Sequence, residues 1–444
     1  MRKCSYLCGM QAEFEAHVRS SFPEFFGKRL LLACSAGLDS TVLAHLLARM
    51  GLDLQLAHAN FNLRGQESEE DQSFVSKLAT QLDTISLVKN FDTIGYVNQH
   101  KVSVQMAARD LRYGWFGELL AGGVADLLVT AHHADDSLET FLINLSRGTG
   151  LDGLSGIPSR TGAIRRPLLP FGRDQLEAYA RAEGIAWRED HTNAELGYLR
   201  NRFRHQVVPA LKGACPDILE RLGHTQENLR ESRMLIDTYM TGVRSRVSRG
   251  DGSVTRFDCE ALRQLGSLKA HLFELFREYG FTDWRAVASL LEGETGREVH
   301  SATHRLLRDR DSLLLKQIEA PQAFEYPVPL DGSATSLPIR LAIRKTDRIT
   351  GTDPRILYID KETLKGGLLL RKWRKGDYFY PLGMGGRKLV SKFFRDAAMS
   401  RFEKEAQWLL CSGDDIVWVV GRRADDRFKV TGQTSEILKI IWED

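Results

Sequence analysis

The chain has 444 residues, and at roughly 150 residues per domain its length predicts about three domains. Hydrophobic residues make up 43% and charged residues 27%, which is typical of a folded protein and excludes disordered, collagen-like and membrane classes. No run of about 18 apolar residues occurs, and no apolar leader follows the basic residues near the start. We therefore expect a cytoplasmic protein without a membrane partner. The sequence sets no oligomeric state.

The distribution of charge says more than the net charge of +3. Between residues 371 and 395 the chain carries eight basic residues and one acidic residue, so the remainder is net acidic. The same segment holds six aromatic side chains, a mixture that suits phosphate neutralisation together with base stacking. It predicts a nucleic-acid contact, with a solvated basic face as the alternative. The six cysteines include no C-x-x-C pair, which disfavours a zinc or iron–sulfur centre.

Apolar runs alternate with helical patterns through the first third of the chain. The runs predict buried strands at 29–35, 53–60, 84–91 and 126–133, and the 3.6-residue periodicity predicts helices at 40–50, 67–82 and 103–120. Such alternation produces a parallel sheet that helices cover on both faces. We therefore expect a doubly wound α/β domain that binds its ligand beyond the carboxyl ends of the strands.

The pattern changes after this α/β region. Pro209 and the turn at 213–216 indicate a boundary near residue 215, and apolar spacing predicts one long helix over 218–240. A mixed, mainly helical part follows, ending in a hairpin at 303–317, and four of the twelve prolines mark 320–338 as a linker. Strands at 355–360, 367–373, 415–421 and 436–442 then predict a small α+β domain. The predicted domains are 1–215, 216–320 and 321–444.

The segment SAGLDS, residues 35–40, lies between the first predicted strand and a helix that opens at Ser40. A strand, a turn of small residues and a helix start together leave backbone N–H groups open to a phosphate. The segment lacks the lysine of a Walker loop and resembles the S-G-G-x-D-S loop of the ATP pyrophosphatases. Ala36 stands where that loop has its first glycine, which suggests a negative φ there. A tight strand–helix turn without a ligand is the alternative.

Acidic and histidine side chains follow the fourth predicted strand, in TAHHADDSLET (130–140). Glu139 lies three or four residues from Asp136 and Asp135, a spacing that puts carboxylates on one helical face beside the turn. Such anions repel one another unless a cation joins them, either Mg²⁺ with ATP or an ammonium group of a substrate. The alternatives are an acidic cluster that stabilises the helix dipole and a zinc site.

Taken together, several motifs make the chain similar to the tRNA(Ile)-lysidine synthetase family of PP-loop ATP pyrophosphatases. Their order and spacing agree over about the first 215 residues, and the segment KWRKGDYFYPLGMGGRKLVSKFF resembles the C-terminal domain of that family. The N-terminal motifs are SAGLDS, HANFNLRG (58–65), ARDLRY (108–113), TAHHADDSLET, RGTGLDGLSGI, RRPLL (165–169), EDHTN (189–193) and RNRFRH (200–205). Two positions depart from the family: Ala36, and Phe61 where many members have a histidine. The run KLVSKFFRDAAMS is looser than usual.

The resemblance implies a PP-loop fold and an ATP-dependent ligase. It would adenylate the wobble cytidine of an isoleucine tRNA with a CAU anticodon and then join L-lysine to C2. Asp39 would hold ATP and its Mg²⁺, Arg112 would stabilise the charge of departing pyrophosphate, and Asp135, Asp136 and Glu139 would hold lysine or Mg²⁺. The remaining ATP contacts would come from Ser35, Ala36, Gly37, Leu38 and Ser40. His132, Asp135 and Asp39 remain open as acceptors of the amine proton, and we expect the pKa of His132 to lie near the working pH, which suits this role. Asp136 joins the catalytic set.

The tRNA would lie on two basic surfaces. The expected contacts are Arg200, Arg202 and Arg204 near the catalytic domain, and Arg371, Lys372, Arg374 and Lys388 farther along the chain. Two alternatives use the same motifs: a tRNA thiolase, which needs cysteines near the site, and an RNA-binding protein whose nucleotide site has decayed.

Overall fold

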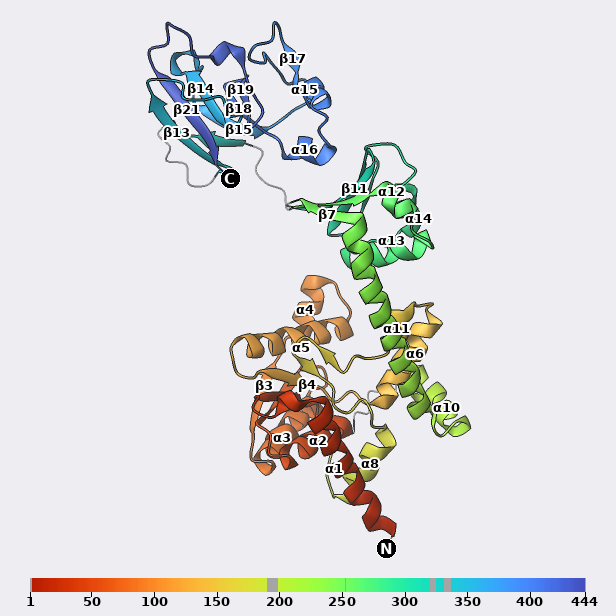
Figure 1. Ribbon diagram of the computed structural model, residues 1–444. Helices are drawn as coiled ribbons and strands as arrows, with labels where there is room; N and C mark the ends of the chain where they lie inside the picture. The colour runs from red at the N-terminus through yellow and green to blue at the C-terminus, as the bar shows by residue number, and fades with distance from the viewer. Residues whose placement is uncertain (1, 190–198, 252, 320–324, 331–336, 444) are drawn as a thin grey trace. The chain divides into compact units, whose positions relative to one another are not determined.

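The computed structural model, drawn in Figure 1, describes residues 2–189, 199–251, 253–319, 325–330 and 337–443. Its helices and strands group into two units, Met1–Thr238 and Tyr239–Asp444. None of the helices in the described ranges is long and apolar enough to cross a membrane.

The first unit is organised by a sheet with the strand order β3-β2-β1-β4-β6-β5. All neighbours are parallel except the β5–β6 hairpin, which confirms the predicted parallel sheet. The strands are β1 (Leu30–Ala33), β2 (Leu54–Asn60), β3 (Ile85–Asn90), β4 (Leu127–Val129), β5 (Arg160–Thr161) and β6 (Ile164–Arg165). Because β1 lies between β2 and β4, the strand order reverses there. The carboxyl ends of β1 and β4 therefore form the crevice in which such sheets bind ligands.

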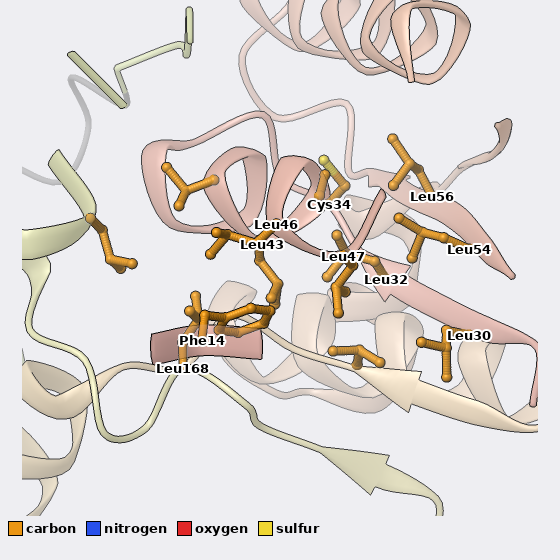
Figure 2. Packing of buried hydrophobic residues seen from close by; sticks show 14 of the residues in the cluster. Phe14, Leu30, Leu32, Cys34, Leu43, Leu46, Leu47, Leu54, Leu56 and Leu168 are labelled. Atoms are coloured by element: carbon orange, nitrogen blue, oxygen red, sulfur yellow. The ribbon is translucent and has the colours of Figure 1, made fainter. Parts of the chain in front are cut away.

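Helices cover both faces of this sheet. They are α1 (Arg2–Ser21), α2 (Leu38–Arg49), α3 (Gln66–Gln81), α4 (Thr93–His100), α5 (Val104–Ala121), α6 (Ala134–Ser146), α7 (Leu151–Leu154) and α8 (Arg173–Ala182). Leu30 and Leu32 of β1 pack into the core with α1, α2, α3 and α8, part of which Figure 2 shows. Leu31 points to the opposite face and packs with Trp115 and Phe116 of α5. This alternation is the two-residue period of a strand buried on both sides.

A helical segment closes the first unit and continues into the second. It comprises α9 (Leu199–Arg202), a π-helical turn (Phe203–Val207), α10 (Val208–Ala214) and α11 (Ile218–Val247). The long helix predicted from residue 218 is confirmed and extends to Val247. Leu138 of α6 packs with Val208 and Leu222, so this segment lies against α6.

The second unit begins with an antiparallel sheet of order β7-β8-β11-β10-β9. Its strands are β7 (Ser248–Asp251), β8 (Val254–Asp258), β9 (Glu298–His300), β10 (His304–Asp309) and β11 (Ser312–Gln317), accompanied by α12 (Cys259–Arg263), α13 (Leu268–Phe276) and α14 (Trp284–Ser289). The predicted hairpin is β10–β11. The part predicted as mixed and mainly helical thus contains more sheet than the periodicity indicated, because β7, β8 and β9 are short.

The remainder of the second unit is a β-rich α+β domain, as predicted. One sheet has the order β12-β15-β18-β19-β20, another β13-β21-β14, and a small one pairs β16 with β17. The strands are β12 (Glu325–Val328), β13 (Arg340–Thr346), β14 (Ile356–Asp360), β15 (Leu368–Lys372), β16 (Tyr378–Phe379), β17 (Lys388–Leu389), β18 (Trp408–Ser412), β19 (Asp415–Val419), β20 (Arg423–Ala424) and β21 (Ile437–Glu443). The helices are α15 (Val390–Asp396) and α16 (Arg401–Ala406).

The predicted linker over 320–338 is corrected in part. Residues 325–328 form β12, which pairs with β15 at the edge of its sheet. An edge strand tolerates Pro327 because its missing N–H is not needed by a second neighbour. Residues 320–324 and 331–336 of the predicted linker lie outside the described residues.

Candidate active site

The loop Ser35–Ser40 lies at the carboxyl end of β1, as predicted. Helix α2 begins at Leu38, two residues earlier than expected, because the buried Leu38 side chain joins the core under the helix. Gly37 is the N-cap and supplies no side-chain hydrogen bond. The first N–H groups of a helix have no acceptor within it, and in α2 no capping side chain occupies them. This arrangement suits an anion.

Ala36 corrects the expectation of a negative φ. Its φ is +67°, the left-handed conformation that costs a non-glycine residue about 1–2 kcal/mol. The residue is fully buried, and its carbonyl accepts hydrogen bonds from the Arg188 backbone N–H at 3.0 Å and from Thr41 Oγ1 at 3.3 Å. Ala36 therefore keeps the glycine-like conformation of the loop, held by contacts from outside it.

The two serines of the loop differ in position. The buried Ser40 hydroxyl accepts from the Ser35 backbone N–H at 3.2 Å and donates to the Gly37 carbonyl at 3.1 Å. Ser35 is exposed, and its Oγ lies 3.3 Å from Ser40 Oγ. Ser40 thus shapes the loop from inside, whereas Ser35 is open to solvent.

Asp39 stands in the first turn of α2 with one carboxylate oxygen free. Its Oδ1 is buried and has no hydrogen-bond partner within the described structure, and its Oδ2 lies 3.5 Å from His133 Nε2. Burial alone would raise the pKa of the Asp39 carboxyl, but His133 and the nearby Arg173 and Arg204 outweigh it, so the pKa lies below its ordinary value. A buried, unpartnered, ionised oxygen fits a hard cation such as Mg²⁺.

That single oxygen is the extent of the metal-binding signal. Over the ranges that the structure describes, no group of three or more His, Cys, Asp or Glu side chains is arranged to hold a metal ion. Mg²⁺ commonly binds proteins through one or two carboxylates together with substrate phosphates and water, so Asp39 alone is compatible with it.

The acidic cluster at the start of α6 is buried and already carries cations of the chain itself. Arg204 donates to Asp136 at 2.9 Å and to Glu139 at 2.6 Å, and Arg200 donates to Glu139 at 3.2 Å. Asp135 accepts from Lys212 at 2.9 Å. The cation that mutual repulsion demands is therefore supplied within the protein, rather than by Mg²⁺ or a substrate alone as the sequence led us to expect.

The three carboxylates do not share one face. Asp135 Oδ2 accepts from the Arg173 backbone N–H at 2.7 Å, while Asp136 and Glu139 share Arg204. Burial acts to raise the pKa of Asp135, yet the hydrogen bonds from Arg173 and Lys212 hold it below its ordinary value. The spacing predicted that Asp135 or Asp136 would lie beside Glu139, and Asp136 is the one that shares Arg204 with it. Asp135 instead accepts from the N-terminus of α8, which is remote in sequence.

The pKa values of the adjacent histidines, His132 and His133, are shifted in opposite directions. Burial lowers the pKa of His132 to about 4, and its Nδ1 lies 2.9 Å from Thr130 Oγ1. This corrects the expectation that His132 titrates near the working pH. His133, the N-cap of α6, is buried too, but the carboxylates of Asp39, Asp136 and Asp135 outweigh burial and raise its pKa. His133 Nε2 is 3.5 Å from both Asp39 and Asp136, so it links the loop to the cluster, a role that the sequence pattern did not assign to it.

Arg112 of α5 is a largely buried cation. Its guanidinium lies over the ring of Phe61 at 5.4 Å, its Nε is buried with no hydrogen-bond partner in the described structure, and burial lowers its pKa. Phe61 in turn stacks on Phe91 at 5.8 Å. These two rings follow β2 and β3, so Arg112 belongs to the same sheet edge as the nucleotide loop.

The arginines of the helical segment after residue 199 differ in burial. Arg204 is half-buried and pairs with the acidic cluster, Arg200 is exposed but pairs with Glu139, and Arg202 is exposed. Of the motif EDHTN, residues 190–193 lie outside the described residues.

The basic segment of the second unit divides in the same way. Arg371 is only 6% exposed and donates to both oxygens of Asp377, at 2.8 and 3.0 Å. Lys372 Nζ lies 3.7 Å from the centre of the Trp408 ring, and burial lowers its pKa to about 8. Lys388 pairs with Asp396 at 2.7 Å, and Arg374 is exposed but pairs with Glu325. The exposed basic residues also include Lys375, Arg387, Lys392 and Arg395.

Comparisons with known proteins match these units. Residues 10–211 match the family model of a PP-loop domain, 250–318 that of the TilS substrate binding domain and 368–442 that of the TilS substrate C-terminal domain. The chain is 38% identical to a tRNA(Ile)-lysidine synthase of Parabacteroides distasonis over 92% of this chain and 94% of the relative. It is 37% identical to one of Porphyromonas gingivalis over 91% and 92%.

Among solved structures, the U34-tRNA thiolase NcsA from Methanococcus maripaludis aligns with a TM-score of 0.42 at 18% identity, covering 50% of this chain and 78% of that one. Values this low carry no argument about function.

Proposed function

Because this chain belongs to the tRNA(Ile)-lysidine synthase family, we propose that it ligates L-lysine to C2 of the wobble cytidine of tRNA(Ile) with a CAU anticodon. The chain is an ATP-using enzyme of tRNA modification. One observation carries the proposal: Asp39 of the nucleotide loop and Asp136 of α6 meet at His133 Nε2, each at 3.5 Å. The nucleotide loop and the acidic cluster therefore line one crevice. We also place the reaction in the cytoplasm.

The reaction has two steps. The cytosine O2 attacks the α-phosphorus of ATP and pyrophosphate leaves; the lysine ε-amine then attacks C2, the C2–O bond breaks, AMP leaves and the amine loses a proton. Splitting the substitution in this way replaces a poor leaving group by a good one. The backbone N–H groups of the loop hold the phosphates, and Arg112 faces the charge that develops on pyrophosphate. Mg²⁺ held by Asp39 would add positive charge on the phosphate oxygens.

The acceptor of the amine proton can be narrowed. Both oxygens of Asp135 are occupied, by Lys212 and by the Arg173 N–H, and the free oxygen of Asp39 would hold Mg²⁺. His132 remains, and its low pKa keeps it unprotonated at neutral pH. Asp136 and Glu139 are already paired with Arg204 and Arg200, so an incoming ammonium group would share these carboxylates with the arginines.

The proposed tRNA surface rests on exposed cations. Arg200 pairs with Glu139 of the acidic cluster, Arg202 is exposed on the same helical segment, and Arg374, Arg387, Lys392 and Arg395 are exposed in the second unit. Arg371, Lys372 and Lys388 contact other residues of the second unit and have a structural role in this surface. Arg204 stabilises the acidic cluster of α6. The three-domain division at 215 and 320 is retained as part of the proposal, because one family-model match falls in each part.

The test is a ligation assay with purified protein, ATP, radiolabelled lysine and a tRNA(Ile) transcript with cytidine at the wobble position. We expect label in the RNA, none when uridine replaces that cytidine, and AMP release that requires the tRNA. A thiolase would need a sulfur donor; the cysteine that adjoins the loop, Cys34, is buried and burial raises its pKa. Sulfur-dependent modification, or RNA binding without AMP, would replace the proposal.

Asp39→Asn removes the ionised oxygen from the loop, and we expect AMP release to fall by about 10² to 10³ while tRNA affinity stays unchanged. Asp53→Asn is the matched control, because Asp53 is an exposed carboxylate on the loop leading to β2. Full activity of Asp39→Asn would remove Asp39 from the nucleotide site.

A further inference from the structure

The nucleotide loop is held from outside by a residue that follows α8. The Arg188 backbone N–H donates to the Ala36 carbonyl at 3.0 Å. The Arg188 side chain is fixed at its other end: Nε donates to Asp71 Oδ1, and Nη2 donates to Glu70 Oε2 at 2.9 Å. The two acids are neighbours on α3, so the arginine is gripped by one turn of that helix.

Further contacts fix both the side chain and the backbone of Arg188. Asp71 is buried and also receives Arg64 Nη2 at 3.0 Å, which fixes the carboxylate in place. The hydrogen bond to Asp71 raises the pKa of Arg188, with Glu70 adding to it. Next to Arg188, Trp187 packs against the core, so the backbone N–H has little freedom to leave Ala36.

The consequence for the loop follows from peptide geometry. The Ala36 carbonyl and the Gly37 N–H belong to one planar, trans peptide unit and point in opposite directions. Contacts from Arg188 and Thr41 that fix the carbonyl therefore also fix the direction of the Gly37 N–H. Ala36 does not favour this arrangement by itself, because its φ of +67° is one that alanine rarely adopts.

We propose that Arg188 is a positioning residue for nucleotide binding: its ion pairs with Asp71 and Glu70 hold its backbone N–H on the Ala36 carbonyl and so preset the Gly37 N–H for a phosphate. The inference rests on the proposed function, since it takes ATP as the occupant of the loop. It explains how the loop tolerates alanine at a position that demands a glycine-like φ.

The experiment is a double-mutant cycle in the full chain, with ATP affinity measured by calorimetry. Arg188→Ala should weaken ATP binding about five- to thirtyfold, since the loop then loses its hold on a disfavoured conformation. In an Ala36→Gly background the same change should cost less than about threefold, because glycine adopts this φ without help. Arg188→Lys, which keeps one ion pair, should fall between wild type and Arg188→Ala.

The control is Arg221→Ala, which removes an exposed ion pair with Asp217 at the start of α11 and does not involve the residues that hold the loop. It should leave ATP affinity unchanged. Equal effects of Arg188→Ala in the wild-type chain and in the Ala36→Gly background, or an unchanged ATP affinity in Arg188→Ala, would overturn the positioning role. Failure of the wild-type chain to bind ATP at all would instead overturn the proposed function.

Discussion

The acidic cluster of α6 and the basic segment of residues 371–395 look like opposites in sequence, yet they are built alike. Each contains more like charge than a folded protein tolerates unpaired, and in each the fold pairs buried charges within the chain while a charge of the same sign in or beside the group stays available. Asp135 and Glu139 are buried against Lys212 and Arg204, and Arg371 is buried against Asp377. Beside the cluster Asp39 keeps a free oxygen, and in the basic segment Arg387 faces solvent.

A count of charged residues in a segment therefore overestimates the number of charges that are free to bind a ligand. A charge that is paired and buried cannot leave its partner cheaply, because the partner would then be a lone buried ion. Available charge is therefore a property of the fold, and substitutions of neighbouring residues should separate into losses of stability and losses of binding.

The largest effect is expected from Arg204→Met, which leaves Asp136 and Glu139 without their shared cation. We expect a loss of about 3–5 kcal/mol in the free energy of unfolding, measured by urea denaturation, together with loss of ligation. Arg202→Met, on the same segment but exposed, should change stability by no more than about 0.5 kcal/mol. Equal effects of the two would mean that the cluster is not sustained by Arg204.

In the basic segment, reversing the exposed charges as Arg387→Glu, Lys392→Glu and Arg395→Glu should weaken tRNA binding at least about tenfold. The slope of log affinity against log salt should become shallower by roughly 0.7–0.9 for each phosphate that is no longer neutralised. Filter binding over a salt series measures both. Arg371→Leu should instead lower stability with tRNA affinity unchanged in the folded protein, and an affinity loss without destabilisation would reverse the assignment.

A smaller effect is expected at Phe61, which lies beneath Arg112 at the nucleotide site. Phe61→Leu removes the ring beneath the Arg112 guanidinium, and we expect a three- to tenfold slower release of pyrophosphate, in line with a cation–π contact of about 0.5–2 kcal/mol. Phe61→Tyr keeps the ring and should retain the rate. Identical rates for leucine and tyrosine would exclude the contact from catalysis.

The mildest test follows the two histidines by NMR in isotopically labelled protein, assigned with His132→Gln and His133→Gln. We expect His132 to titrate with a pKa of about 4 and His133 with a pKa above the ordinary value of 6.5. Because the folded-state pKa of His133 is raised, its contribution to stability is complete below about pH 6.5 and disappears as the pH rises through that raised value. Titration of both near the ordinary value would contradict the linkage of His133 to Asp39 and Asp136.

Features set by local periodicity were predictable from the sequence. The strand–helix alternation predicted β1 to β4 and placed Ser35–Ser40 and the acidic cluster at the strand ends where the structure has them. The hairpin β10–β11 and the C-terminal strands followed in the same way.

Features set by long-range pairing were not predictable in this way. Arg204 and Lys212 join carboxylates more than sixty residues earlier in the chain, and no periodicity connects them. Ala36 was expected to follow the preference of an isolated alanine, whereas Arg188, about 150 residues away, decides its conformation. His132 was expected to titrate near the working pH, whereas burial lowers its pKa to about 4.

The alternation of β1 has a consequence for how this protein can evolve. Leu30 and Leu32 face one helical layer and Leu31 the other, so a one-residue insertion in the strand would exchange the layers and also turn the outgoing backbone by half a turn. The leucines touch no reactant, yet they determine where the chain emerges above the sheet. Selection that preserves the apolar packing of β1 therefore also preserves the position of the nucleotide loop.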